Sequence, residues 1–210
     1  MTTVLVIAKE PRPGRVKTRL TPPFSPAEAA ALAEAALADT LRTAALLPAS
    51  RHVLVLDGRP GPWLPPGFEV VPQVGGGLDV RLAAAFGACV GPALLIGMDT
   101  PQITPGLLEP ALSWGTYDAW FGPAEDGGFW ALGLARPDPA LLLGVPMSVP
   151  ETGAVQYARL RAAGLRVGEL PVLRDVDGAE DARRVATAAP GTDFAAAYRE
   201  LVADTAGAGR

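Results

Sequence analysis

The sequence opens MTTVLVIAKEPRPGRVKTRL (residues 1–20), in which a short apolar run passes directly into a loop rich in cations. Residues 2–8 are rich in Val, Leu and Ile, which is typical of a buried strand in a parallel sheet. Prolines and a glycine then loosen the chain among five cations: Lys9, Arg12, Arg15, Lys17 and Arg19. Lys9 and Lys17 are the only lysines, although the chain has 18 Lys+Arg residues. Because an ammonium is a compact point charge and a guanidinium a planar fork, the loop indicates a role for ammonium chemistry, with a solvated basic surface as the alternative.

Length and composition predict one domain with one substantial core. The chain has 210 residues, of which 49% are hydrophobic, and we expect a single domain over residues 1–203 followed by a flexible tail at 204–210. The net charge of −4 and the pI of about 5.1 exclude a global field that attracts nucleic acid or an anionic membrane. The basic cluster at the start is therefore a local feature.

The rare residue types exclude several kinds of protein. A single cysteine, Cys89, and a single histidine, His52, exclude a disulfide framework and a structural zinc site. Both residues adjoin apolar runs, which favours a buried structural thiol over a nucleophile for Cys89 and a packing or surface role over catalysis for His52. The first apolar run is too short for a signal peptide, and no stretch approaches the roughly 18 apolar residues of a membrane helix. We therefore expect a cytoplasmic protein.

Strand-like and helix-like segments alternate along the chain. Strands are expected at residues 2–8, 52–56, 68–72, 93–97, 118–122, 128–134 and 166–173. Helices are expected from the capping box Ser25–Pro–Ala–Glu28 to about residue 47, at 78–90, after residue 104, at 152–163 and after residue 178. This alternation predicts a mostly parallel sheet covered by helices on both faces. The two strands that flank PAEDGG (residues 123–128) resemble a hairpin, so one antiparallel strand is expected.

Polar motifs follow several of the expected strands, and strand ends of such a sheet meet at one edge, where ligands bind. The basic loop suits a polyphosphate, although it lacks the spacing of a Walker P-loop. Lys9, Lys17 and Arg19 are placed to neutralise a departing pyrophosphate or nucleoside diphosphate. Arg12 and Arg15 are expected at the rim.

Carboxylates follow two other strands. Asp99 in GMDTP ends a buried strand, where an acid is costly unless it binds a cation or caps backbone N–H groups. Asp175 and Asp177 in DVDG follow the last strand and are candidates for the same cation, with an Asx turn as the alternative. Mg²⁺ takes one or two carboxylates together with water and phosphate oxygens, so these residues suffice for a magnesium site.

Two glycine-containing segments allow a substrate to approach the backbone. In QVGGGLDVRL (residues 73–82) three glycines admit a nucleobase or ribose, and Arg81 either meets a phosphate or pairs with an acid such as Asp79. In GPAEDGGFWALGL (residues 122–134) the glycines form either a plain hairpin turn or a site loop. In a site loop, Glu125 or Asp126 would orient an acceptor or act as a base.

The four motifs together resemble a known family. AKEPRPGRVKTRL, GMDTP, GPAEDGGFWALGL and DVDGAED, in this order over residues 4–181, resemble the DUF2064 proteins, often labelled glycosyltransferases associated with radical-SAM/selenodomain clusters. The resemblance implies a GT-A-like, Rossmann-like three-layer α/β sandwich with a mixed, mostly parallel seven-stranded sheet. The opening motif is also similar to the 2-phospholactate guanylyltransferases of coenzyme F420 synthesis. GMDTP is similar to the metal-binding aspartate segment of molybdenum-cofactor nucleotidyltransferases.

The resemblance also implies roles for individual residues. It implies that Lys9, Lys17 and Arg19 bind donor phosphates and that Asp99, with Asp175 or Asp177, holds the metal. The base and ribose would face Gln73, Gly75, Gly76, Gly77 and Leu78. The acceptor side would be lined by Asp126, Gly127 and Gly128. The chain departs from the family pattern at Met147-Ser148-Val149, where relatives have a WST-like segment, at Gly178-Ala179 in place of Thr-Pro, and at Asp79 in place of glycine.

These observations lead to one functional hypothesis with two alternatives. The hypothesis is a transferase that depends on Mg²⁺, with Mn²⁺ as the alternative metal, and moves a nucleotidyl group from an NTP to a phosphorylated acceptor. Lys17, Arg19 and Asp126 are its expected catalytic residues. The alternatives are a glycosyltransferase that uses an NDP-sugar and a non-catalytic nucleotide-binding module. The expected partners are a nucleotide donor and a small-molecule acceptor, without nucleic acid or membrane.

Overall fold

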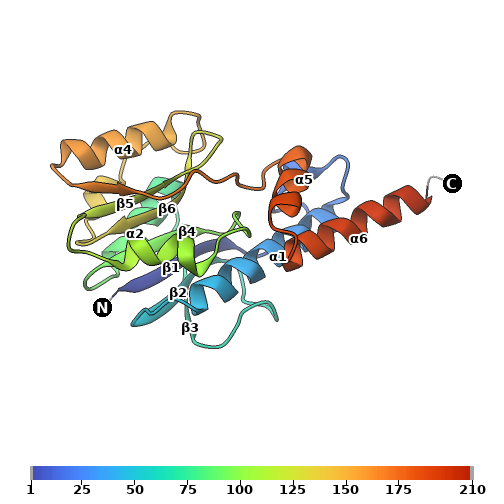
Figure 1. Ribbon diagram of the computed structural model, residues 1–210, viewed down its shortest axis with the longest axis horizontal. Helices are drawn as coiled ribbons and strands as arrows, with labels where there is room; N and C mark the ends of the chain where they lie inside the picture. The colour runs from blue at the N-terminus through green and yellow to red at the C-terminus, as the bar shows by residue number, and fades with distance from the viewer. Residues whose placement is uncertain (1, 209–210) are drawn as a thin grey trace.

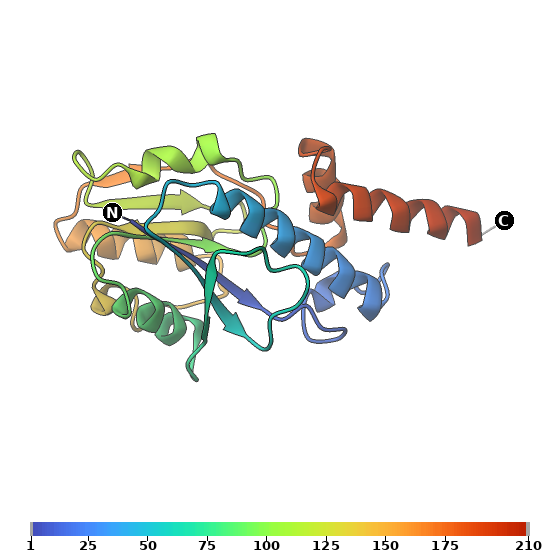
Figure 2. The same ribbon diagram turned by 90° about the horizontal axis from the view of Figure 1, so that it is seen from below.

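The computed structural model describes residues 2–208, which form a seven-stranded sheet with helices on both faces (Figures 1 and 2). The strands are β1 (Thr3–Lys9), β2 (Arg51–Asp57), β3 (Phe68–Pro72), β4 (Ala93–Gly97), β5 (Ala119–Pro123), β6 (Phe129–Leu134) and β7 (Val167–Glu169). The helices are α1 (Pro26–Ala45), α2 (Leu78–Gly87), α3 (Pro105–Leu108), α4 (Thr152–Ala162), α5 (Ala179–Ala188) and α6 (Asp193–Ala208). Short 3₁₀ turns are η1 (Thr18–Leu20), η2 (Glu109–Leu112) and η3 (Pro139–Leu141).

The sheet is mixed and mostly parallel, as the sequence predicted. Its strand order is β3-β2-β1-β4-β6-β5-β7, and β6 alone runs antiparallel to its neighbours within the described residues. Leu132 of β6 pairs with Leu95 of β4 on one side and with Phe121 of β5 on the other. Because β6 is reversed, its first residues lie at the edge where the parallel strands end. We call this edge the carboxyl edge.

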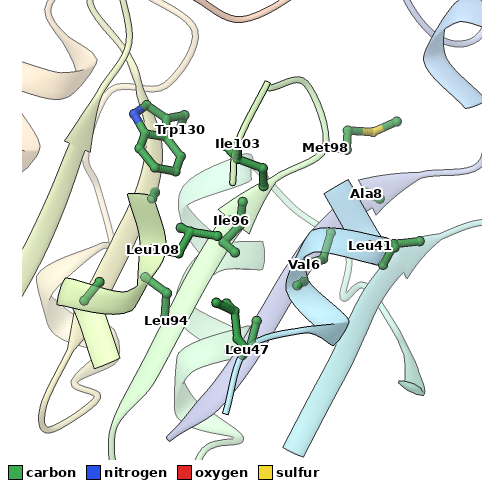
Figure 3. Packing of buried hydrophobic residues seen from close by; sticks show 14 of the residues in the cluster. Val6, Ala8, Leu41, Leu47, Leu94, Ile96, Met98, Ile103, Leu108 and Trp130 are labelled. Atoms are coloured by element: carbon green, nitrogen blue, oxygen red, sulfur yellow. The ribbon is translucent and has the colours of Figure 1, made fainter. Parts of the chain in front are cut away.

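Alternating apolar residues explain why the sheet is covered on both faces. Val4, Val6 and Ala8 of β1 pack on one face with α1, α3 and η2, whereas Leu5 packs on the other face with α2, η3 and α4. Figure 3 shows part of the first layer, in which Val6 and Ala8 lie near side chains from α1, β4 and α3. The result is the expected three-layer sandwich.

A third apolar cluster lies beside the sheet and joins η1, α1, α5 and α6 through Leu20, Leu32, Val185 and Phe194. The buried Asp39 of α1 caps the start of α6, because its carboxylate accepts the Phe194 N–H at 2.8 Å. In both views α6 then projects beyond the rest of the molecule (Figures 1 and 2). This cluster attaches the end of the chain to the basic loop near its start.

Local sequence signals place most element boundaries correctly. Ser25 Oγ accepts the Glu28 N–H at 3.3 Å, and Glu28 returns the contact to the Ser25 N–H at 2.7 Å, which is the expected capping box. The last strand is shorter than the expected residues 166–173. Pro171 has no N–H to donate, and beyond β7 the pairing is reduced to the Leu170 N–H on the Phe121 carbonyl and an isolated bridge between Leu173 and Ala124.

The remaining sequence expectations concern single residues and the chain end. Cys89 is half-buried, and burial raises the pKa of its thiol. The His52 ring packs against Phe68 with centroids 5.5 Å apart. Helix α6 continues to Ala208, past residue 204 where a flexible tail was expected, and residues 209 and 210 lie outside the described residues. Over the described part of the chain, none of the helices has the length and apolar character needed to cross a membrane.

Candidate active site

A cleft of about 910 Å³ opens at the carboxyl edge, where β1 and β4 end and β6 begins. Twelve of the fourteen residues proposed from sequence line it: Lys9, Lys17, Arg19, Gln73, Gly76, Gly77, Leu78, Asp99, Asp126, Gly128, Asp175 and Asp177. The other two, Gly75 and Gly127, are not among its lining residues. Chain segments that are more than 150 residues apart therefore meet in one cleft because their strands end at the same edge.

Lys17 has an unusual backbone conformation. Its φ is 48°, in the left-handed region that costs a non-glycine residue about 1–2 kcal/mol. Among the described non-glycine residues only Ser148, with φ 60°, shares this feature, and it lines the same cleft. Strained backbone of this kind concentrates at functional sites. Lys17 lines the cleft and directly precedes η1.

The Lys17 ammonium contacts carboxylates of the chain. Its Nζ lies 2.8 Å from Asp99 Oδ2 and 4.0 Å from Asp177 Oδ1, and the side chain is only 10% exposed. Arg19 pairs with the other oxygen of Asp177 from the solvent side. The cations and acids picked out in the sequence thus face each other directly.

Backbone contacts explain why Asp99 lies beside the segment 174–177. The Asp99 carbonyl accepts the Val176 N–H at 2.9 Å. Gln102 Nε2 donates to the Arg174 carbonyl at 2.5 Å. These bonds join the loop after β4 to the segment before α5, so the acids from both segments enter the cleft together.

Asp175 has a strongly raised pKa. Burial, with a smaller contribution from the Asp126 carboxylate, raises its pKa to about 6, while the Lys17 ammonium acts in the opposite direction. A carboxylate in this state gains from a cation placed beside it. The position of Asp175 is therefore suited to a neighbouring positive charge.

We expect Asp175→Asn to stabilise the protein in a pH-dependent way. An unfolded aspartate has a pKa of about 3.9, so the folded wild type binds this proton more tightly and loses that stabilisation as the pH rises through about 6. Asparagine does not ionise, so the variant should gain about 1–2 kcal/mol over wild type between pH 5 and 7.5. Urea unfolding at both pH values measures this, with Glu109→Gln as an exposed acid control. A variant-to-wild-type difference that is constant over this range would contradict the assignment.

The acids fit a hard cation only in part. Carboxylate oxygens are the donors that Mg²⁺ and Mn²⁺ prefer, and Asp99, Asp175 and Asp177 all line the cleft. However, no group of three or more His, Cys, Asp or Glu within residues 2–208 has the arrangement of a metal site, and the Lys17 ammonium lies against Asp99. The chain fits a metal held by one or two carboxylates, with the remaining ligands from substrate phosphate and water.

The α2 side of the cleft is organised by Gln73 and Arg81. Gln73 Nε2 donates to the carbonyls of Ala8 at 2.7 Å and Val55 at 3.1 Å, and its Oε1 accepts from Arg81 at 3.2 Å. Arg81 Nε also donates to the Gly76 carbonyl at 3.0 Å. The hydrogen bonds of the Gln73 side chain thus join the ends of β1 and β2. Contact with a base would fall to the glycine backbone and to the exposed Leu78.

The opposite side of the cleft is formed by the loop before β6 and the segment before α4. We call it the β6 wall and define it by the residues Asp126, Phe129, Met147, Ser148, Val149 and Pro150. Asp126 Oδ1 accepts the Gly128 N–H at 2.8 Å, which shapes the turn. Glu125, the alternative base considered from sequence, instead pairs with Arg174 and does not line the cleft.

Gly127 serves the packing of the β6 wall rather than the cleft. Its φ is +90°, and a Cβ on it would lie 2.0 Å from the Pro150 carbonyl oxygen. Its own carbonyl accepts the Gly153 N–H at 2.7 Å. Only glycine permits this approach, which attaches the two halves of the wall to each other.

We expect Gly127→Ala to destabilise the protein by about 2–4 kcal/mol, because the new methyl group collides with backbone and the positive φ adds strain. Gly191→Ala is the matched control, since a Cβ there meets nothing within 4 Å. Urea unfolding compares the two. Equal stability of both variants would show that the wall is not packed as described.

The structure adds residues that sequence reasoning did not select. Thr100 is 1% exposed and lines the cleft, and its Oγ1 has no hydrogen-bond partner among the described residues. A buried hydroxyl without a partner costs about 1–3 kcal/mol, so Thr100 is a further candidate residue of the site. Its place directly after Asp99 was the available signal. Ser148 was noted only as a departure from the family, and its positive φ has no sequence signature.

Comparison with solved structures places the architecture. A provisionally assigned nucleotide-diphospho-sugar transferase from Desulfovibrio desulfuricans G20 is 27% identical, with a TM-score of 0.86 over 96% of this chain and 95% of that one. The manganese complex of Rv0371c from Mycobacterium tuberculosis H37Rv is 21% identical, with a TM-score of 0.53 over 88% and 96%. The 2-C-methyl-D-erythritol 4-phosphate cytidylyltransferase from Thermus thermophilus is 15% identical, with a TM-score of 0.54 over 90% and 98%.

The chain therefore has the GT-A-like fold that is shared by nucleotidyltransferases and nucleotide-sugar transferases. Residues 29–149 match the family described as "Uncharacterized protein conserved in bacteria (DUF2064)", and the chain belongs to this family. The basic loop after β1 and the acids Asp175 and Asp177 lie outside the matched range. The comparison with curated proteins finds no match.

Proposed function

We propose that this protein is a divalent-metal-dependent transferase that uses a nucleotide-activated donor, and that the group it transfers is a nucleotidyl group. The observation that carries the proposal is the opposition of Lys17 and Arg19 to Asp99 and Asp177 in a strand-end cleft. Such a site neutralises phosphates with its cations and holds their metal with its acids. The neighbouring folds support a nucleotide donor.

In this proposal the chain performs three tasks. Lys9, Lys17 and Arg19 bind the donor phosphates and stabilise the pyrophosphate that leaves. Asp99, with Asp175 or Asp177, would hold Mg²⁺ or Mn²⁺, which supplies further neutralisation of phosphate charge. Asp126 orients the acceptor and receives its proton.

Glycosyl transfer from an NDP-sugar is the second candidate. The likeness to the Desulfovibrio protein favours it. The cations favour nucleotidyl transfer instead, because five of them line the cleft and a triphosphate brings the larger negative charge.

The test is a panel of NTPs and NDP-sugars with Mg²⁺ or Mn²⁺, measured first as thermal stabilisation and then as release of pyrophosphate or NDP. Stabilisation by an NTP together with pyrophosphate release is the expected result. NDP release from an NDP-sugar would favour the second candidate. Binding without release in every mixture would indicate a non-catalytic module, and no stabilisation by any nucleotide would contradict the proposal.

A further inference from the structure

The charges that line the cleft are distributed unequally. Its lining cations come from the end of β1, from the loop after it and from α2: Lys9, Arg15, Lys17, Arg19 and Arg81. In the sheet order these elements lie on the β1–β3 side of β4, whereas β6 and β5 lie on the other side. Among the described lining residues, the β6 wall contains neither Lys nor Arg.

The β6 wall is mostly apolar, with one hydroxyl and one acid. Phe129 and Met147 pack partly into the core beneath it, and Val149 is 40% exposed. Ser148 supplies the hydroxyl. Of the six residues that define the wall, Asp126 is the one with a charged side chain. A phosphate bound here would therefore meet hydrocarbon and a carboxylate.

Two cations that could serve the β6 wall as counter-ions, Arg174 and Lys17, are already paired with acids. Arg174 pairs with both Glu125 and Asp181 and does not line the cleft. Lys17 is held by Asp99 on the other side. Because the proposed function assigns Lys17 to the donor phosphates and Arg174 is paired outside the cleft, neither cation serves the β6 wall.

The wall is also preformed. Thr152 Oγ1 donates to the Pro146 carbonyl at 2.8 Å and accepts the Val149 N–H at 3.2 Å. The contact between Gly127 and Gly153 attaches this segment to the turn before β6. A bound acceptor therefore meets these side chains in a defined arrangement.

We propose that the acceptor reacts through a hydroxyl group and carries no phosphate, so that it is an uncharged alcohol or sugar. A phosphate monoester carries about −1.5 to −2 charge, and placing it against Asp126 without a cation is unfavourable. A hydroxyl donates to Asp126 and accepts from Ser148, while Val149 and Met147 cover its carbon skeleton. This differs from the phosphorylated acceptor expected from sequence, and it rests on the proposed function.

The transfer step balances with such an acceptor. The acceptor oxygen forms a bond to the α-phosphorus of the donor, and the bond from that phosphorus to the bridging oxygen breaks. Pyrophosphate leaves on the cation side, and the hydroxyl proton moves to Asp126. Ser148 and Val149 are then the residues that determine acceptor specificity.

The test asks whether a phosphate ester binds beside a bound nucleotide. Phenyl phosphate is observed by saturation-transfer NMR in the presence of a saturating NTP chosen from the panel. In wild type the NTP should displace it completely. Val149→Lys places an ammonium on the β6 wall. With the NTP present, its signal from bound phenyl phosphate should exceed that of wild type by about tenfold or more. Leu143→Lys, at a site 46% exposed and outside the cleft lining, should behave as wild type.

The outcomes separate this inference from the function it rests on. Phenyl phosphate that stays bound to NTP-saturated wild type, or product formed from glucose 1-phosphate or glycerol 3-phosphate, overturns the uncharged acceptor. A folded Val149→Lys variant without gain places Val149 outside the acceptor subsite and also overturns it. Failure of every NTP to bind removes the proposed function itself.

Discussion

Lys17→Ala is expected to reduce metal-dependent turnover by about 10²–10³-fold while the protein remains folded. The Lys17 ammonium lies 2.8 Å from Asp99 on a side chain that is only 10% exposed, and the other lysine of the chain, Lys9, is at the end of β1. Its removal leaves the departing phosphate without this charge. Pyrophosphate release with the NTP that binds measures the loss.

The same variant should bind Mn²⁺ more tightly when no nucleotide is present, because the ammonium no longer competes for Asp99. Isothermal titration measures this change without requiring turnover. Arg12→Ala is the matched control, since Arg12 is an exposed cation of the same loop that pairs with Glu10 at 3.8 Å and does not line the cleft. Unchanged turnover in Lys17→Ala would show that this ammonium does not bind donor phosphate.

Asp99→Asn is expected to weaken Mn²⁺ binding by at least about 10²-fold and to abolish metal-dependent turnover. The amide keeps the size of the side chain but loses the negative charge that a hard cation requires. The folding cost should be about 1 kcal/mol or less, because Asp99 is 36% exposed and its pair with Lys17 lies at the cleft surface.

Glu69→Gln is the control for Asp99→Asn. Glu69 lies on the edge strand β3, away from the carboxyl edge, and pairs with Arg51 of β2. Loss of the Glu69 charge should leave metal binding unchanged. Titration with Mn²⁺ and urea unfolding are measured on both variants. Wild-type affinity in folded Asp99→Asn would remove Asp99 from the proposed metal ligands.

Local patterns in the sequence were enough to predict the layers of the fold. The apolar run of β1 alternates sides, so Val4 and Val6 reach one layer and Leu5 the other. The capping box at Ser25 began α1 as expected. The turn Asp126–Gly128 reversed β6 and produced the antiparallel strand. These features depend on neighbours within a few residues, which is why a single sequence carries them.

Most of the residues selected from the sequence line the cleft, and their roles there stay predictions. Asp99, Asp175 and Asp177 were selected because they follow strands, and strand ends of a parallel sheet converge. Gln73 was expected to face a base, yet its amide is bonded to the Ala8 and Val55 carbonyls. These hydrogen bonds depend on how β1, β2 and β3 lie beside one another, and no local sequence pattern encodes that arrangement.

The sequence by itself determined the secondary-structure periods, the mixed parallel sheet and the edge at which charged residues gather, because each follows from residue types at short spacing. Only the tertiary structure decided that Lys17 pairs with Asp99, that Gly127 admits the Pro150 carbonyl, and that the six residues of the β6 wall bring no cation to the cleft. Those facts arise from contacts between distant segments, whose distances are set by packing of the whole core. The cations of the basic loop therefore meet the carboxylates of Asp99 and Asp177 only when the sheet is assembled.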